Sequence, residues 1–188
     1  MADADVRLAA PSDVPEIARI QLTTWRSAYA ELLPPEALAS VDENAARRSW
    51  EEALHGGQVT LLVATEGEWT AGFCAAGRAP EQEAAAANGT PPPDAATVAL
   101  VSTLLVEPRW GRRGHGGRLL ATMAQQLAEG GATRGITWVP EEDSASLAFF
   151  EHAGWGPDGT VRTLDAAGRP LRELRLSGPL DLELSRPE

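Results

Sequence analysis

Residues 106–120, VEPRWGRRGHGGRLL, bring glycine and arginine together in a spacing that suits anion binding. Glycines at 111, 114, 116 and 117 lie between a strand-like run and an apolar helical run. Such a turn leaves the backbone accessible, and the first N–H groups of the following helix point outward at the positive end of its dipole. Arg112, Arg113 and Arg118 add positive charge around these amides. The segment therefore predicts a phosphate site at the start of a helix.

Two nucleotide-binding motifs do not fit this segment. It lacks the G-K-[ST] ending of a nucleoside triphosphate loop, so there is no lysine for the γ-phosphate and no hydroxyl for magnesium. It also lacks the third glycine of G-x-G-x-x-G, because Leu119 occupies that position. A nucleotide-binding protein is therefore disfavoured. No cluster of side chains has the spacing of metal ligands, so no metal is expected either.

The composition limits the classes of partner. The 188 residues have a formal net charge of −11, and every basic residue is an arginine. Nucleic acid is not an expected partner, because phosphate backbones need a broad basic face, whereas a cationic acceptor is compatible with an acidic chain.

No run approaches the roughly 18 apolar residues of a membrane helix, and no secretory signal is recognisable. The single cysteine, Cys74, lies in an apolar run, which predicts a buried structural thiol and a cytoplasmic protein.

Hydrophobic periodicity predicts the elements that would position the glycine-rich turn. A strand over 5–10 precedes a helix over 14–30, where Asp13 and Glu16 form a capping-box pattern. The other elements expected are a broken helical stretch over 35–56, strands at 59–65 and 71–77, a central strand at 97–106, a helix after the turn, a strand at 135–139, a helix at 144–153 and a terminal hairpin of 161–165 and 171–177. We expect one domain over 1–188, with 79–95 as a mobile loop and 181–188 as a loose tail.

Two segments resemble motifs of one family. V-x-P followed by R-R-G-H-G-G-x-L-L is similar to the acyl-CoA-binding pattern [RQ]-x-x-G-x-[GA] of the GNAT superfamily of N-acetyltransferases. Residues 143–155, DSASLAFFEHAGW, resemble its N-x-x-A-x-x-[FL]-Y-x-x-x-G-F segment, and 25–34 resemble an N-terminal segment of bacterial members. The resemblance implies the α/β (α+β) GNAT fold. This fold has one mixed, mostly antiparallel central sheet with splayed central strands and helices on both faces.

The resemblance also implies an enzyme that uses acetyl-CoA as its co-substrate and acylates an amine by direct attack. Backbone N–H groups of the turn would bind the CoA pyrophosphate, and the strand before it would pair with the pantetheine arm. For His115 the backbone is expected to matter more than the ring. The backbone N–H of Leu105 would stabilise the tetrahedral oxyanion. The cofactor-binding residues implied are Leu104, Leu105, Val106, Arg112, Arg113, Gly114, His115, Gly116, Gly117, Asp143 and Phe150.

The chain departs from the family pattern at the positions that handle protons. The tyrosine that many members use as general acid is Phe150 here, and the glutamate of the central strand is replaced by Leu100 or its neighbour. Tyr29 is a candidate acid, although its spacing from Trp25 fits the wall of an acceptor site at least as well.

Glu107 is the first candidate for the general base, and Glu31 is the second. Glu107 fits an ordinary turn residue equally well. Because both usual proton-transfer positions are altered, a CoA-binding sensor or interaction protein with little catalytic activity is the alternative to an N-acetyltransferase. The acceptor would be the primary amine of a small molecule or of a protein, and the terminal hairpin is compatible with a homodimer.

Overall fold

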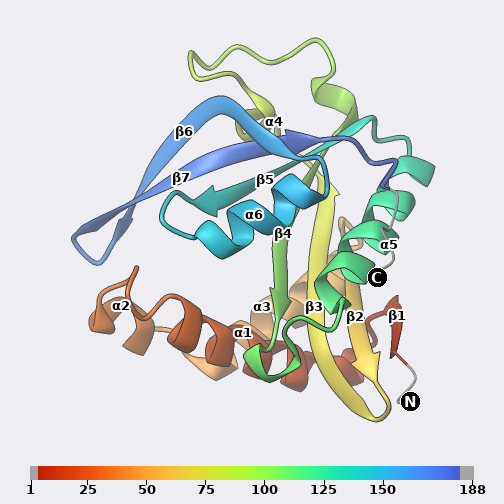
Figure 1. Ribbon diagram of the computed structural model, residues 1–188, viewed down its shortest axis with the longest axis vertical. Helices are drawn as coiled ribbons and strands as arrows, with labels where there is room; N and C mark the ends of the chain where they lie inside the picture. Colours follow the sequence, from red (N-terminus) through yellow and green to blue (C-terminus); the bar gives the residue numbers. More distant parts are fainter. Residues whose placement is uncertain (1–3, 183–188) are drawn as a thin grey trace.

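The computed structural model describes residues 4–182 of the chain, and in these residues seven strands form one sheet. The order across the sheet is β1-β2-β3-β4-β5-β7-β6, and β4–β5 is the parallel pair among antiparallel neighbours (Figure 1). The strands are β1 (Ala4–Leu8), β2 (Val59–Glu66), β3 (Trp69–Arg78), β4 (Val98–Val106), β5 (Arg134–Pro140), β6 (Gly156–Ala166) and β7 (Arg169–Gly178). The expected mixed, mostly antiparallel sheet is confirmed, with the strand of 98–106 at its centre.

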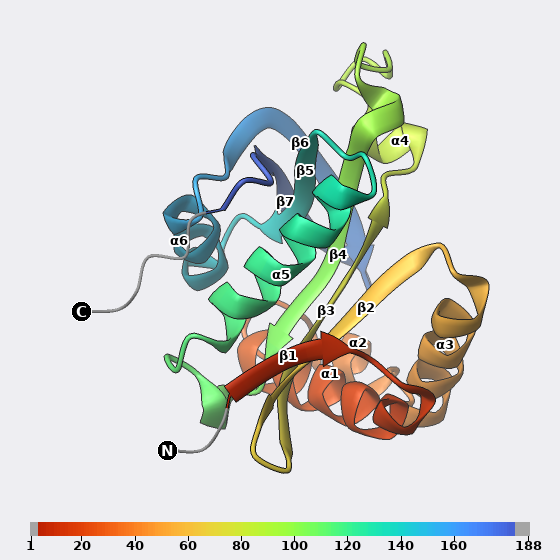
Figure 2. The same cartoon turned by 90° about the vertical axis from the view of Figure 1, so that its right-hand side faces the viewer.

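Helices cover both faces of the sheet, as expected. Figure 2 shows α1 and α3 on one face and α5 and α6 on the other. The helices are α1 (Val14–Ala28), α2 (Pro35–Ala39), α3 (Glu43–Gly56), α4 (Glu81–Ala84), α5 (His115–Glu129) and α6 (Ser144–His152). The apolar stripe of α5 packs against the sheet through Leu119, Leu120 and Met123. The apolar stripe of α1 packs against the opposite face through Ile17 and Ile20. None of the described helices is long and apolar enough to span a membrane.

The predicted capping box at the start of α1 is wrong. The Asp13 side chain makes no capping bond to this helix. Its two oxygens instead accept hydrogen bonds from Arg7 at 2.7 and 2.9 Å, and one of them also accepts from the amide of Ala10. An ion pair with β1 therefore replaces the expected local bond, and it fixes the first strand to the start of the first helix.

The parallel strands β4 and β5 separate along their length. Their ladder extends only from Val98 to Leu100, and Thr137 Oγ1 then donates to the carbonyl of Val101 at 2.8 Å. The register of β4 against β3 shifts at Ser102, which stands as an extra residue between the pairs of Val101 and Thr103. Such a bulge bends a strand. Beyond it the two strands diverge, which confirms the expected splay.

Segment 79–95 is more ordered than the sequence suggested. It contains α4, and its Ala84 and Ala85 are buried. Arg175 of β7 donates to the carbonyls of Glu83 at 2.8 Å and Ala85 at 2.7 Å. Long-range hydrogen bonds therefore hold part of this segment in place, while the expected mobility of 79–95 stays a prediction.

Two other expectations concern single features. Cys74 is fully buried in β3, and burial raises the pKa of its thiol, as expected of a structural cysteine. Of the tail expected at 181–188, only 181 and 182 are described, and Leu182 packs against the core. Residues 183–188 lie outside the described part of the chain.

Candidate active site

The glycine-rich turn between β4 and α5 presents a run of backbone N–H groups. Gly114 precedes the helix with a φ of 79°, and Arg112 also has a left-handed φ of 61°. Within residues 4–182, no backbone or side-chain group accepts a hydrogen bond from the amides of 112–117. The first amide to bond is that of Arg118, to the carbonyl of Gly114 at 3.0 Å. Successive free amides at a helix N-terminus form an anion site, as the sequence predicts.

The ring of His115 fixes this turn to the end of β2. The ring is buried, and its Nε2 lies 2.9 Å from Glu66 Oε2. Arg118 donates to Nδ1 at 3.2 Å, so Nδ1 accepts and Nε2–H donates to Glu66. The hydrogen bond from His115, together with Arg113 at 2.8 Å, lowers the pKa of Glu66. The backbone of His115 was expected to matter more than its ring, and the structure adds this contact of the ring with Glu66.

Glu107 lies in an ion-pair cluster outside the cavity described below. Arg19 donates to both of its oxygens, at 2.9 and 3.1 Å, and Arg109 donates to one of them at 2.8 Å. The hydrogen bond from Arg19 is the main cause that lowers the pKa of Glu107. These contacts match the turn interpretation. Glu31, the second candidate base, is exposed, and its carbonyl accepts from Arg169 of the β6–β7 hairpin at 3.2 Å.

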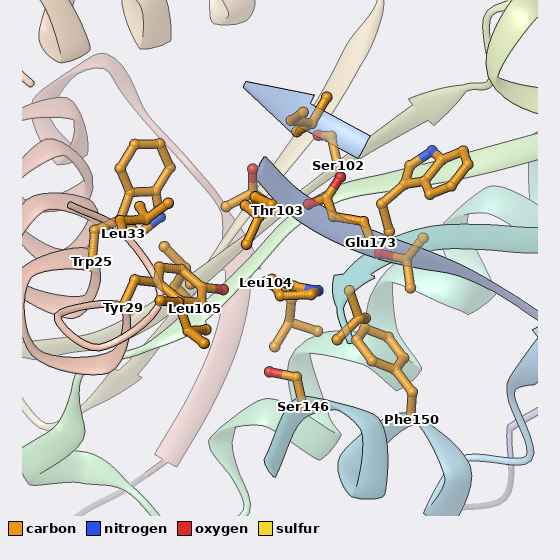
Figure 3. A pocket seen from close by; sticks show the side chains of 17 residues that line it. Trp25, Tyr29, Leu33, Ser102, Thr103, Leu104, Leu105, Ser146, Phe150 and Glu173 are labelled. Carbon is orange, nitrogen blue, oxygen red and sulfur yellow. The ribbon is translucent and has the colours of Figure 1, made fainter. Parts of the chain in front are cut away.

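A cavity of about 270 Å³ lies where β4 and β5 diverge (Figure 3). Its walls come from the end of α1 and the following loop, from β4 and β5, from α6 and from the terminal hairpin. Of the predicted site residues, the structure brings Trp25, Tyr29, Leu104, Leu105 and Phe150 to this one space. Segments from both ends of the chain therefore meet at the splay.

The register of β4 decides which of its amides face the gap. The amide of Glu107 donates to the carbonyl of Ala71 in β3 at 2.9 Å, and Leu105 stands opposite Phe73 in the same register. Alternate residues of an antiparallel strand direct their backbone groups to opposite sides, so the Leu105 N–H also points to β3. The amides of Leu104 and Val106 point to the gap instead. Of these two amides, that of Leu104 belongs to a residue that lines the cavity, whereas the Leu105 N–H expected to face the gap points to β3.

Tyr29 and Glu173 direct polar groups into the cavity (Figure 3). Burial, with the negative charges of Asp143 and Glu173, raises the pKa of Tyr29 to about 12. Glu173 is buried on β7, and its Oε2 accepts from Arg162 Nε at 2.6 Å. Glu173 was not among the residues expected at the site. The strand LRELRLS has no clean alternation that marks this carboxylate, and only the folded hairpin brings it to the splay.

Helix α6 contributes two of the predicted residues. Phe150 lines the cavity and is 5% exposed, and it packs on Trp155 with ring centroids 5.5 Å apart. Its phenyl ring has no proton to donate, so the usual acid position offers no acid. Asp143 caps the helix, because its carboxylate accepts from the amide and the hydroxyl of Ser146 at 3.0 and 2.7 Å. Its predicted contact with the cofactor stays a prediction.

Over the described part of the chain, no three histidine, cysteine or carboxylate side chains gather as metal ligands would.

The profile of the acetyltransferase (GNAT) family matches residues 16–155. The uncharacterized N-acetyltransferase YuaI of Bacillus subtilis is 27% identical over 176 residues, which are 93% of this chain and 92% of that protein.

Solved structures share the fold. The PaiA N-acetyltransferase of Thermoplasma acidophilum, solved with coenzyme A, has a TM-score of 0.72 and 13% identity, covering 94% of this chain and 99% of its own. The protein yncA of Salmonella typhimurium, solved with acetyl-CoA, has a TM-score of 0.70 and 17% identity, covering 100% and 99%. The expected GNAT fold is thereby confirmed.

Proposed function

The chain belongs to the acetyltransferase (GNAT) family, and we propose that it transfers the acetyl group of acetyl-CoA to a primary amine in the cavity at the splay. The observation that supports this most directly is that unbonded backbone donors occur in two places that one ligand could use. They are the amides of 112–117 and those of Val106 and Leu104 on the open edge of β4, and Leu104 lines the cavity.

The residues of the turn fit the charged part of acetyl-CoA. The amides of 112–117 would bind the pyrophosphate, and Arg112 and Arg113 supply positive charge in place of the side chain that Gly111 lacks. The open edge of β4 would pair with the amide groups of the pantetheine arm. Acetyl-CoA itself supplies the activated acyl group, as a thioester.

The Leu104 N–H is the donor that we assign to the oxyanion. When the amine nitrogen attacks the thioester carbonyl, negative charge develops on the carbonyl oxygen, and a fixed N–H in a water-poor cavity stabilises it. The C–N bond forms, the C–S bond breaks, and the CoA thiolate leaves. Side-by-side binding of both reactants supplies much of the acceleration.

Glu173 is the group that we assign to the proton of the attacking amine. An ammonium group with a pKa of about 10 must lose a proton before it attacks. Glu173 is the carboxylate that lines the cavity, and Arg162 orients it at 2.6 Å. We give it the role first considered for Glu107, because Glu107 is paired with two arginines and does not line this cavity.

Tyr29 takes part as a hydrogen-bond donor to the departing sulfur. Its pKa of about 12 lies well above the value of about 8.5 typical of a thiol, so a complete proton transfer to the thiolate is unfavourable. The phenol stays protonated and stabilises the thiolate by a hydrogen bond. Trp25 and Tyr29 would also form one wall of the acceptor site.

The first experiment separates an enzyme from a sensor. We expect acetyl-CoA and CoA to raise the melting temperature of the purified chain, whereas ATP and NAD do not. Release of free thiol from acetyl-CoA in the presence of an amine panel then shows transfer. Stabilisation by CoA without thiol release from any amine would support the sensor alternative. The homodimer and the cytoplasmic location stay predictions, and gel filtration tests the dimer.

A further inference from the structure

The charge of the cavity wall indicates which amines it accepts, if the proposed function is correct. We infer that the acceptor is a monocationic primary amine with an apolar body and no carboxylate or phosphate. Among residues 4–182, Glu173 is the only Asp, Glu, Arg or His that lines the cavity, and the chain has no lysine. The wall therefore offers a negative partner for an ammonium group and no positive partner for an acid.

The arginines nearest the cavity already have partners. Arg162 donates to Glu173 at 2.6 Å and also to Glu83 of α4 at 3.0 Å. Arg172 forms an ion pair with Glu141 at 3.3 Å. An acceptor with a carboxylate would have to bury that group beside Glu173 without a compensating cation, which is strongly unfavourable.

A third arginine, Arg169 at the start of β7, also has a partner. Arg169 Nη1 donates to the carbonyl of Glu31, which joins the tip of the β6–β7 hairpin to the loop after α1. Arg169 does not line the cavity. This bridge brings hairpin and loop together without offering a free positive group to the interior.

The electrostatics of Tyr29 are consistent with this charge distribution. Apart from burial, the causes that raise its pKa are the negative charges of Asp143 and Glu173. The cavity is therefore negative where the phenol lies. A negative cavity favours a cation and disfavours an amino acid, whose carboxylate lies two bonds from its amine.

Apart from Glu173 and Tyr29, the wall formed by the end of α1, the loop after it and the terminal hairpin is apolar, whereas β4, β5 and α6 add the hydroxyl groups of Ser102, Thr103, Thr137 and Ser146. Leu32, Leu33, Leu164 and Leu171 line it together with the indole of Trp25. Leu164 is 40% exposed, so the apolar wall continues to the surface. The volume of about 270 Å³ must also contain the thioester, and it lies just below the range of about 300–1,000 Å³ of most ligand pockets. The buried end of the acceptor is therefore a few carbon atoms long.

Matched pairs of amines test the inference with the full chain and saturating acetyl-CoA. Isopentylamine and leucine differ only by the carboxylate, as do phenethylamine and phenylalanine. We expect kcat/KM for thiol release to be at least about 100-fold higher for each amine than for its amino acid. Leucinamide, which keeps a substituent of similar size without the charge, should lie nearer to isopentylamine.

Two variants test the cause of the preference. Glu173→Gln should raise the Kd of isopentylamine for the CoA-bound protein at least about 10-fold in calorimetry, because the ammonium loses its charged partner. Glu141→Gln, at an exposed carboxylate outside the cavity, should leave this Kd unchanged. Leu171→Arg should raise kcat/KM for leucine relative to isopentylamine by about 10-fold, since it supplies the missing cation.

The outcomes separate the two proposals. Thiol release with leucine and phenylalanine at rates equal to or above those of the amines would overturn the inference and leave the proposed function standing. Tight amine binding without any thiol release would overturn the proposed function but not the binding preference. An unchanged Kd in Glu173→Gln would show that Glu173 does not bind the ammonium, and would overturn the inference.

Discussion

Tyr29 and Glu173 line the same cavity, and the negative charge of Glu173 acts on the Tyr29 phenol. Tyr29 directly follows α1, and Glu173 lies on β7, the last strand. Burial raises the pKa of Tyr29 to about 12, and the negative charges of Asp143 and Glu173 contribute to the shift. The loop after α1 and the β6–β7 hairpin thus meet at the splay of β4 and β5 (Figures 1 and 3). The pH at which the Tyr29 phenol loses its proton, read from tyrosinate absorbance, therefore reports this interaction without any measurement of catalysis.

Titration of the phenol is the first prediction. Tyr29 is the only tyrosine of the chain, so tyrosinate absorbance reports it alone. We expect a midpoint near 12 instead of the usual value of about 10, read within milliseconds of a pH jump so that unfolding does not interfere. Glu173→Gln removes one negative charge and should lower the midpoint, whereas Glu141→Gln should not. Equal midpoints in wild type and Glu173→Gln would contradict the coupling.

Tyr29→Phe tests the role of the hydroxyl. A hydrogen bond to a charged group contributes about 1.5–3 kcal/mol, so the variant should lose about 10- to 150-fold in kcat. KM for the amine should change little, because the ring remains in the wall. A raised KM with unchanged kcat would instead show that Tyr29 is only a wall of the acceptor site.

Glu107→Gln separates stability from catalysis. Because Glu107 does not line the cavity, kcat should stay within about twofold of wild type. Its pKa is lowered in the folded state from the usual 4.5, so the carboxylate stabilises the fold above that pH. This contribution is lost as the pH falls through the folded pKa. Urea unfolding should therefore show wild type about 1–3 kcal/mol more stable than the variant at pH 7, with the gap closing in strong acid. A large loss of kcat at full stability would restore Glu107 as the base.

The shape of the turn that we propose to bind phosphate could be predicted from the sequence because it is local. Glycines at and around the start of the amphipathic run of α5 permit backbone conformations that other residues rarely adopt, and Gly114 and Arg112 do have left-handed φ values. The succession of helices and strands along the chain also followed from local periodicity and turn residues. The choice between the Leu104 and Leu105 amides did not, because it depends on the register of β4 against β3.

The position of Glu173, which we propose as the base, could not be predicted because it depends on distant contacts. Glu173 reaches the cavity only when β7 pairs with β5, on the far side of the splay. Segment 79–95 has no amphipathic period, yet Glu83 accepts from Trp138 at 2.6 Å and from Arg162 at 3.0 Å. A single charged residue in such a segment has no local pattern that identifies its partner.

Glu66→Ala tests the contact between β2 and the glycine-rich turn. The variant leaves the buried Nε2–H of His115 without its acceptor, which should lower the free energy of unfolding by more than the control substitution does. The affinity for CoA should also fall, because Arg113 loses the carboxylate that positions it at 2.8 Å. Glu43→Ala, which breaks an exposed i,i+4 pair with Arg47, is the matched control and should cost below about 0.5 kcal/mol. Equal losses in both variants would show that the His115 contact adds nothing.

Gly116→Val tests the packing at the start of α5. A Cβ at this position would lie 3.2 Å from the ring of Phe149 and 3.8 Å from Val106, so a branched side chain must push α6 away from the end of β4. Overpacking of this kind costs about 1–3 kcal/mol. We expect the affinity for CoA to fall by about 5- to 150-fold, because the amides of the turn move relative to the open edge of β4. Isothermal titration with CoA measures the loss. Gly56→Ala is the control, because nothing lies within 4 Å of the added Cβ. Wild-type affinity in Gly116→Val would contradict the proposed binding of the CoA pyrophosphate by the amides of this turn.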